Sequence, residues 1–276
     1  MKGFIITMLS VSLIVIVILL SMSLRNHQLS TERALVEPLP LIYSAFLLDD
    51  VAYEFNSLVG PQISLDETND STRVTLMDSI HGYNHSSDIN AYSAFLTSEV
   101  AARTASNITA NFTNLSNGMM TLFIDEDYVY TNNHTSNESL FTRTGGTGAM
   151  SYDINITITA IREGITPMAF NDSGTMNVTI RYTDLNGTGV EQGSVFPTQQ
   201  NTFKLDYVGG SSMTLTIGPQ SGNSGSLKIK SVGIGADVAW TAVLPRLDAT
   251  KRMGYEYDAT IDYVQGDVSK RCRIGK

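Results

Sequence analysis

Histidine is the first residue type to examine in this 276-residue chain, because it serves both as a general base and as a metal ligand. His81 and His85 are four residues apart, a spacing that suits metal ligation from one face of a helix. The glycine and turn-forming residues at 82–87 argue against a helix there. The other two histidines, His27 and His134, have no GxSxG or HExxH motif beside them. The histidines therefore predict a surface loop around the first pair, no metal site and no catalytic role.

Two acidic stretches could hold a calcium ion if a loop folded their oxygens inward. The first, Asp-Glu-Asp at 125–127, follows an apolar run, and adjacent side chains of a strand point to opposite faces. The second, 184–189, has oxygen-bearing side chains at its first, third and fifth positions, but Val195 stands where the closing glutamate belongs. Asn186-Gly187 is also a common hairpin-turn pair. We predict plain turns at both places.

Other signals of catalysis are weak. The Gly-Gly-Thr-Gly run at 145–148 lacks the lysine and the strand-to-helix context of a phosphate loop. Cys272 is the single cysteine, which excludes an intrachain disulfide and a cysteine zinc site. It predicts a free thiol, with pairing to a second chain as the alternative. No carboxylate pair is singled out for sugar hydrolysis. We predict a non-catalytic protein without a cofactor.

Asparagine gives a clearer pattern. Of 18 asparagines, 11 begin an Asn-x-Ser/Thr triplet, where chance predicts roughly four. Such an excess indicates glycan acceptors on an exported surface, and the alternative is a Thr- and Asn-rich β composition. Many triplets without a disulfide fit a prokaryotic, and in particular an archaeal, envelope better than a eukaryotic secreted domain. The glycosylation candidates are Asn69, Asn84, Asn107, Asn111, Asn114, Asn133, Asn137, Asn155, Asn171, Asn177 and Asn186.

The uncharged run 4–24 predicts a transmembrane helix. Its 21 residues would span roughly 32 Å, close to the thickness of the hydrocarbon core of a bilayer. A cleaved signal peptide is the alternative, but its apolar core is usually shorter. The numbers of positive charges on the two sides of this run are nearly equal, so the orientation is inferred from the glycosylation triplets. We predict a single-pass protein of the cell membrane, N-in/C-out, with the ectodomain outside the cell.

The net charge of −9 makes a general nucleic-acid partner improbable. Four of the last seven residues, 270–276, are nevertheless positive. This segment predicts a solvated basic tail, with contact to anionic headgroups or an acidic neighbour as the alternative.

Hydrophobic periodicity then places the elements. Leu47, Val51, Phe55 and Leu58 recur at helical spacing and predict a juxtamembrane helix over 42–59, which needs the ectodomain or a second copy as its partner. A third helix is predicted over 88–116. In it, glycosylation triplets would form a stripe beside a buried stripe that contains Ile108, Phe112 and Leu115.

From residue 119 the apolar period becomes two. Alternating stretches such as 152–159 and 176–183, separated by glycine-rich turns, predict about eight short strands. The predicted fold class is α+β: N-terminal transmembrane and juxtamembrane helices followed by an antiparallel β-sandwich, jelly-roll or immunoglobulin-like. The predicted parts are 1–24 (tip and transmembrane helix), 25–60 (helical stalk), 61–118 (helical, rich in triplets) and 119–276 (sandwich with basic tail).

Lys2-Gly3-Phe4, leading directly into a long apolar helix, resembles the start of a type IV pilin-like precursor. The resemblance covers residues 1–60 and implies cleavage between Gly3 and Phe4, helix packing with copies of the chain, and an outer β-rich domain. Many family members carry glutamate five residues into the mature chain, whereas this chain has Met8. The departure favours a minor pilin-like subunit or a simple anchored protein. The same region resembles archaeal membrane-anchored surface proteins.

Three functions follow from these observations. The first is a structural or adhesive envelope component whose partners are the lipid bilayer, copies of itself or other envelope proteins. The second is a carbohydrate-binding β-sandwich module displayed on the membrane, which rests on fold class alone. The third and least favoured is an envelope hydrolase.

Overall fold

The computed structural model describes residues 21–22, 46–47, 49–51, 53–55, 58–68, 70–80, 86–124, 127–144, 148–245, 254–266 and 268–275. Several sequence predictions lie outside these residues: the processing site at Gly3 and Phe4, the His81/His85 pair, Asn69 and Asn84, and all of the apolar run except Ser21 and Met22. Within the described ranges, no helix combines the length and the apolar character needed to cross a bilayer.

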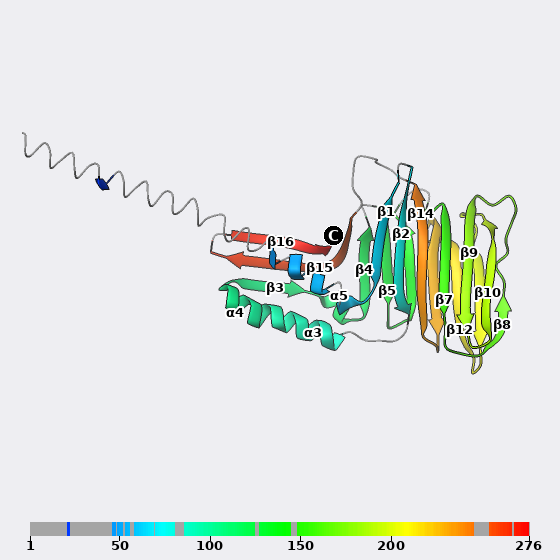
Figure 1. Ribbon diagram of the computed structural model, residues 1–276, viewed down its shortest axis with the longest axis horizontal. Coiled ribbons are helices and arrows are strands. Elements are labelled where there is room, and N and C mark those ends of the chain that lie inside the picture. The colour runs from blue at the N-terminus through cyan, green and yellow to red at the C-terminus, as the bar shows by residue number, and fades with distance from the viewer. Residues whose placement is uncertain are drawn as a thin grey trace, which may run out of the picture.

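Strands dominate the described chain and form two sheets (Figure 1). The six-stranded sheet has the order β1 (Gln62–Glu67), β2 (Ser71–Ile80), β14 (Ala236–Pro245), β7 (Ser151–Thr157), β9 (Met176–Asp184) and β10 (Gly187–Val195). Its pairs are antiparallel except for the parallel pair β7–β9.

The second sheet has ten strands, all paired antiparallel. Its order is β16 (Val268–Gly275), β15 (Tyr255–Gln265), β4 (Met119–Ile124), β5 (Tyr128–Asn133), β6 (Glu138–Arg143), β13 (Asn223–Val232), β12 (Ser211–Gln220), β11 (Asn201–Tyr207) and β8 (Arg162–Thr166), with β3 (Asn107–Asn111) beside β15. The long β15 pairs with β4 near its start and with β3 and β16 farther along, so these outer strands extend beyond the sandwich (Figure 1).

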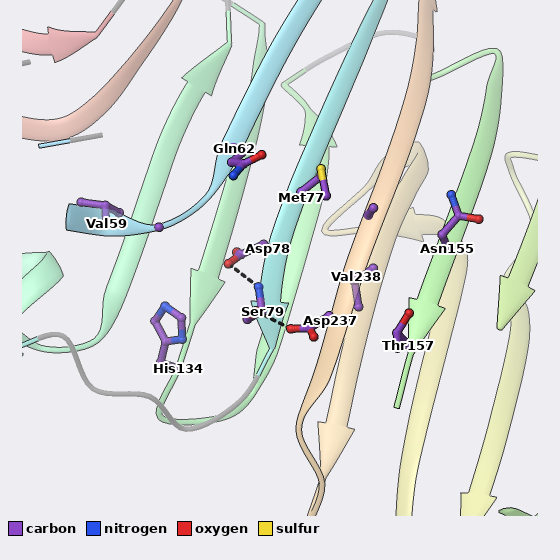
Figure 2. Close-up of a pocket in the computed structure, with 12 residues that line it drawn as sticks. Val59, Gln62, Met77, Asp78, Ser79, His134, Asn155, Thr157, Asp237 and Val238 are labelled. Atoms are coloured by element: carbon purple, nitrogen blue, oxygen red, sulfur yellow. Dashed lines mark hydrogen bonds between the residues drawn. The ribbon is translucent and has the colours of Figure 1, made fainter. Parts of the chain in front are cut away.

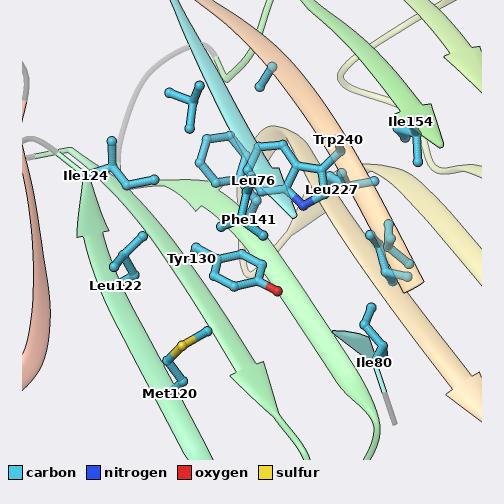
Figure 3. Close-up of a cluster of buried hydrophobic side chains, with 14 of the residues drawn as sticks. Leu76, Ile80, Met120, Leu122, Ile124, Tyr130, Phe141, Ile154, Leu227 and Trp240 are labelled. Carbon is cyan, nitrogen blue, oxygen red and sulfur yellow. The ribbon is translucent and has the colours of Figure 1, made fainter. Parts of the chain in front are cut away.

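The core lies between the two sheets and is rich in aromatic rings (Figure 3). Trp240 of β14 packs against Phe141 of β6 with ring centroids 4.7 Å apart, and against Tyr130 of β5 at 5.9 Å. All three side chains are buried. Because these residues come from both sheets, burial of their apolar surface holds the sheets face to face.

The strand prediction from residue 119 onward is confirmed in its main feature, the inward apolar face. The alternating side chains of 152–158 and 176–182 are buried, while Asn155 and Asn177 between them are exposed. From residue 119 onward the described residues form thirteen strands rather than about eight, because short polar segments also pair. Not every glycine in this region marks a turn: Gly218-Pro219 lies inside β12 at a register shift where Gly218 has φ +144°.

The helix predicted over 42–59 is confirmed where the structure describes it. All of the described residues between 46 and 59 are helical. Val51, Phe55 and Val59 are buried, and Leu47 and Leu58 pack against the same core. The partner of this helix is therefore the β-rich body itself.

The single helix predicted over 88–116 is wrong. Helical backbone runs through α3 (Ser86–Phe95), a π-helical turn η1 (Leu96–Val100) and α4 (Ala101–Thr104), and ends where Ala105 takes a left-handed φ of 49°. β3 follows, and α5 (Thr113–Ser116) is one short turn. Pairing with β15 supplies backbone hydrogen bonds to β3 that a helix would otherwise provide. Ile108, Phe112 and Leu115 are buried as expected, but not on one helix.

Two further segments differ from expectation. Residues 61–118, expected to be helical, begin with β1 and β2, whose inward positions alternate with exposed ones. The basic end of the chain forms β16 rather than a free tail, because Ile274 is buried and Cys272 packs partly against the core. Its arginines pair with β15: Arg271 lies 3.2 Å from Asp262, and Arg273 lies 3.6 Å from Glu256.

Candidate functional site

A groove of about 640 Å³ lies beside β2, at the end of β1 (Figure 2). β1 begins at Gln62, opposite Met77, so residues 78–80 of β2 have no β1 neighbour and their edge stays open. The groove is lined by Val59, Gly60, Gln62, Met77, Asp78, Ser79, His134, Asn155, Thr157, Asp237, Val238 and Ala239. These residues come from the 59–62 segment, β2, β14, β7 and the turn after β5.

Asp78 is the most constrained polar residue of the groove. Its Oδ2 atom accepts hydrogen bonds from the Tyr130 hydroxyl and the Asn132 Nδ2 atom, both at 2.6 Å. Its Oδ1 atom accepts one from the Ser79 backbone N–H at 2.8 Å. Donors from the second sheet therefore fix a carboxylate that belongs to the first sheet.

Burial raises the pKa of the Asp78 carboxyl above its ordinary value, since an ion loses water when it is enclosed. The hydrogen bonds from Tyr130 and Asn132, the positive charge of His134 and the Ser79 amide lower this pKa and offset part of the effect. The pKa of Tyr130 is raised strongly, by burial first and by the Asp78 charge second. Tyr130 thus keeps its proton and stays a hydrogen-bond donor to Asp78.

A second carboxylate, Asp237, stands on the neighbouring strand. In the pairing of β14 with β2, Asp237 lies opposite Ser79, and Val238 lies opposite Asp78. The Ser79 hydroxyl donates to Asp237 Oδ1 at 2.5 Å. Asp237 is exposed, whereas Asp78 is largely enclosed, so the groove holds one carboxylate open to solvent and one anchored within its wall.

His134 is the one described histidine among the four considered in the sequence. It is half-buried, follows β5 directly, and lines the groove together with Asp78 and Asp237. The two aspartates were not recognised from the sequence. The sequence does contain a pattern that could have indicated Asp78. It occupies a position in the alternating apolar series of β2, after Val74 and Leu76 and before Ile80, all of which are buried. A carboxylate at such a position is rarely placed there without a partner.

The acidic stretches considered for calcium are engaged elsewhere. Asp127 Oδ2 lies 3.3 Å from Arg143, and residues 125 and 126 are not described. The buried Asp184 lies 3.4 Å from Arg162 and also accepts a hydrogen bond from the Asn186 backbone N–H at 2.9 Å. These contacts confirm a turn between β9 and β10. Within the described ranges, no cluster of three or more His, Cys, Asp or Glu side chains is arranged to hold a metal ion.

Nine of the candidate glycosylation asparagines are described, and none of these nine is buried. Two of them use the Nδ2 atom, where a glycan would attach, as a donor: that of Asn114 donates to Asp258 at 2.6 Å, and that of Asn186 donates to the Arg162 backbone carbonyl at 3.3 Å. Asn155 stands on the groove, so a glycan there would lie at its edge. Six are exposed (Asn107, Asn111, Asn155, Asn171, Asn177, Asn186) and three are half-buried (Asn114, Asn133, Asn137).

Comparison with known proteins gave no match: no family model fits the chain, and no curated protein or solved structure is significantly similar to it.

Proposed function

We propose that this chain is a non-catalytic, membrane-anchored surface protein whose β-sandwich lies outside the cell as a structural or adhesive component of the envelope. The observation that carries the proposal is the placement of the glycosylation triplets. Six of the nine described triplet asparagines are exposed, including Asn155 and Asn177 within strands whose neighbouring residues are buried. A glycan needs an accessible side-chain amide, and these positions supply one.

The way in which the helical segment at 46–59 joins the body supports an anchored arrangement. Phe55 is fully buried, with its ring 5.1 Å from Phe112 and 5.4 Å from Tyr257. A segment packed this firmly would transmit the position of an anchor to the sandwich. The same arrangement fits a minor pilin-like subunit, whose leading helix packs with copies of the chain or with other envelope proteins.

A binding or structural role also fits the state of Asp78. Both of its oxygens already accept hydrogen bonds, and burial raises its pKa while Tyr130 stays protonated beside it. Such a carboxylate is well placed to receive one more donor.

Mass spectrometry of the protein isolated from its native membranes tests the proposal. We expect hexose-containing adducts at the six exposed triplets and an N-terminal residue of either Phe4, after pilin-type processing, or Met1, in a plain anchor. An N-terminus near residue 24 would instead indicate a secreted protein. An unmodified chain recovered from the cytosol would overturn the proposal.

A further inference from the structure

We propose that the groove beside β2 binds an alkyl chain that ends in a primary ammonium group, as in a lysine side chain or a free polyamine. The proposal goes beyond the surface role and does not depend on it, because it concerns only the groove. It rests on the charge of the groove, on its apolar part and on the fixed position of its carboxylates.

The charges of the groove-lining side chains favour a positively charged ligand. Asp78 and Asp237 both line the groove, and neither lysine nor arginine is among its described lining residues. Of the lining side chains that the structure describes, His134 is the one that can become positive. Asp237 shares the face of its cross-strand neighbour Ser79, whereas Asp78 points to the opposite face of the sheet. An ammonium group would therefore gain a charge-assisted hydrogen bond from one carboxylate at a time, and an anion would be repelled by both.

The apolar part of the groove suits methylene groups. Met77 is 50% exposed although its strand β2 lies between β1 and β14, and Val59 and Ala239 line the same space. An alkyl chain laid over these side chains would cover apolar surface that now faces water. No Phe, Tyr or Trp is among the described lining residues, so a sugar ring would find no phenyl or indole face to stack on. The cavity volume lies within the range of small-ligand sites.

The carboxylates are held before any ligand arrives. Asp78 is fixed by Tyr130, Asn132 and the Ser79 amide, and Asp237 is fixed by the Ser79 hydroxyl. Three accepted hydrogen bonds leave the Asp78 carboxylate with one further acceptor position, on Oδ1. A ligand therefore meets ordered acceptors and loses little free energy in arranging them.

Isothermal titration calorimetry on the full chain, in micelles of a non-ionic polyoxyethylene detergent, tests the proposal. The probes are 1,5-diaminopentane, Nα-acetyl-lysine methylamide, 1,5-pentanediol and maltose. We expect saturable binding of one or both amines and none of the diol, which has the same length without charge. Binding of the diamine alone identifies a polyamine as the source, and binding of the lysine derivative alone identifies a protein side chain.

Matched variants locate the binding. Asp237→Asn should weaken amine binding about tenfold or more, because a hydrogen bond to a charged group is lost. Asp66→Asn, which alters an exposed carboxylate of β1 away from the groove, should leave the dissociation constant unchanged. Asn155→Asp adds a carboxylate to the groove and should tighten binding severalfold, while Asn155→Gln removes the same glycosylation triplet without adding charge.

Three results would overturn the proposal: equal binding of the diol and the diamine, binding of maltose in preference to the amines, or amine binding that responds to neither Asp237→Asn nor Asn155→Asp. The Asn155 variants keep the test decisive if Asp237→Asn fails to fold. None of these results bears on the membrane anchor or the glycans, so failure here is separate from failure of the surface role.

Discussion

Asp78 occupies a position that its strand otherwise gives to apolar side chains. Val74, Leu76 and Ile80 share its face of β2 and are buried. A carboxylate there loses water, and the donors from Tyr130 and Asn132 only partly compensate. Placing a carboxylate here costs folding free energy, whereas a carboxylate on an open surface costs none. The position of Asp78 is therefore stronger support for a binding role than an exposed carboxylate would be.

The raised pKa of Asp78 predicts how the free energy of unfolding varies with pH. The folded state holds this proton more tightly than the unfolded chain, whose carboxyl titrates near 3.8. The contribution to stability is fully present below 3.8 and is lost as the pH rises through the higher pKa of the folded state.

Urea unfolding of the wild type and of Asp78→Asn, at a series of pH values starting below 3.8, measures this effect. Because the variant cannot titrate at this position, the wild type should lose stability relative to it as the pH rises. A difference that is constant with pH, or that changes with the opposite sign, would contradict the prediction.

Cys272 should be a slow nucleophile. Burial raises the pKa of its thiol, with the Lys270 charge as the largest opposing effect, so little thiolate forms at neutral pH. We expect iodoacetamide to modify the folded chain at least about tenfold more slowly than the urea-unfolded chain. Timed alkylation followed by mass spectrometry gives both rates. Equal rates, or a disulfide-linked dimer on a non-reducing gel, would show that the thiol is open.

At the scale of elements, the packing of the hairpin of β9 and β10 requires a glycine at position 189. Tyr182 of β9 faces Gly189 of β10, and a Cβ atom at residue 189 would overlap the tyrosine ring. The same ring lies beneath the Arg162 guanidinium at 4.8 Å, and Arg162 in turn pairs with the buried Asp184. Displacing the ring would therefore disturb an ion pair as well as local packing.

Gly189→Ala should lower the free energy of unfolding by about 1–3 kcal/mol, the usual cost of overpacking. Gly164→Ala on the edge strand β8 is the matched control, because its nearest neighbouring atom would be 3.9 Å from the new Cβ. We expect that control to stay within about 0.5 kcal/mol of the wild type. Equal urea midpoints for the two variants would show that Tyr182 adjusts without cost.

The sequence predicts an element well when the spacing of its apolar residues fits either a helix or a strand but not both. Alternation at 152–158 fits a strand alone, and the structure places that stretch in β7 and just beyond it. The stretch 107–115 fits both periods, since Ile108, Phe112 and Leu115 recur at helical spacing although β15 pairs with β3 there. A distant partner strand decides such cases. The groove shows the same limit: His134 was considered, but only the pairing of β14 with β2 brings Asp237 beside Ser79.

At the scale of the whole molecule, the helical segment at 46–59 belongs to the folded body rather than to a separate stalk. Its buried residues join the core that includes both sheets. The Tyr92 hydroxyl of α3 also donates to Glu54 Oε2 at 3.0 Å, a second link between this segment and the body. A fragment starting at residue 62 would expose the apolar surface that Val51, Phe55 and Val59 cover.

Two substitutions on this segment test its place in the fold. Phe55→Ala should cost about 3–5 kcal/mol, because it removes a fully buried ring that contacts Phe112 and Tyr257. Tyr53→Ala, on the same segment with its ring 80% exposed, should change stability by less than about 0.5 kcal/mol. Fluorescence of Trp240, the single tryptophan, reports unfolding from the centre of the sandwich. If Phe55→Ala left that distant transition unmoved, the segment would fold apart from the sandwich and could not fix the position of an anchor.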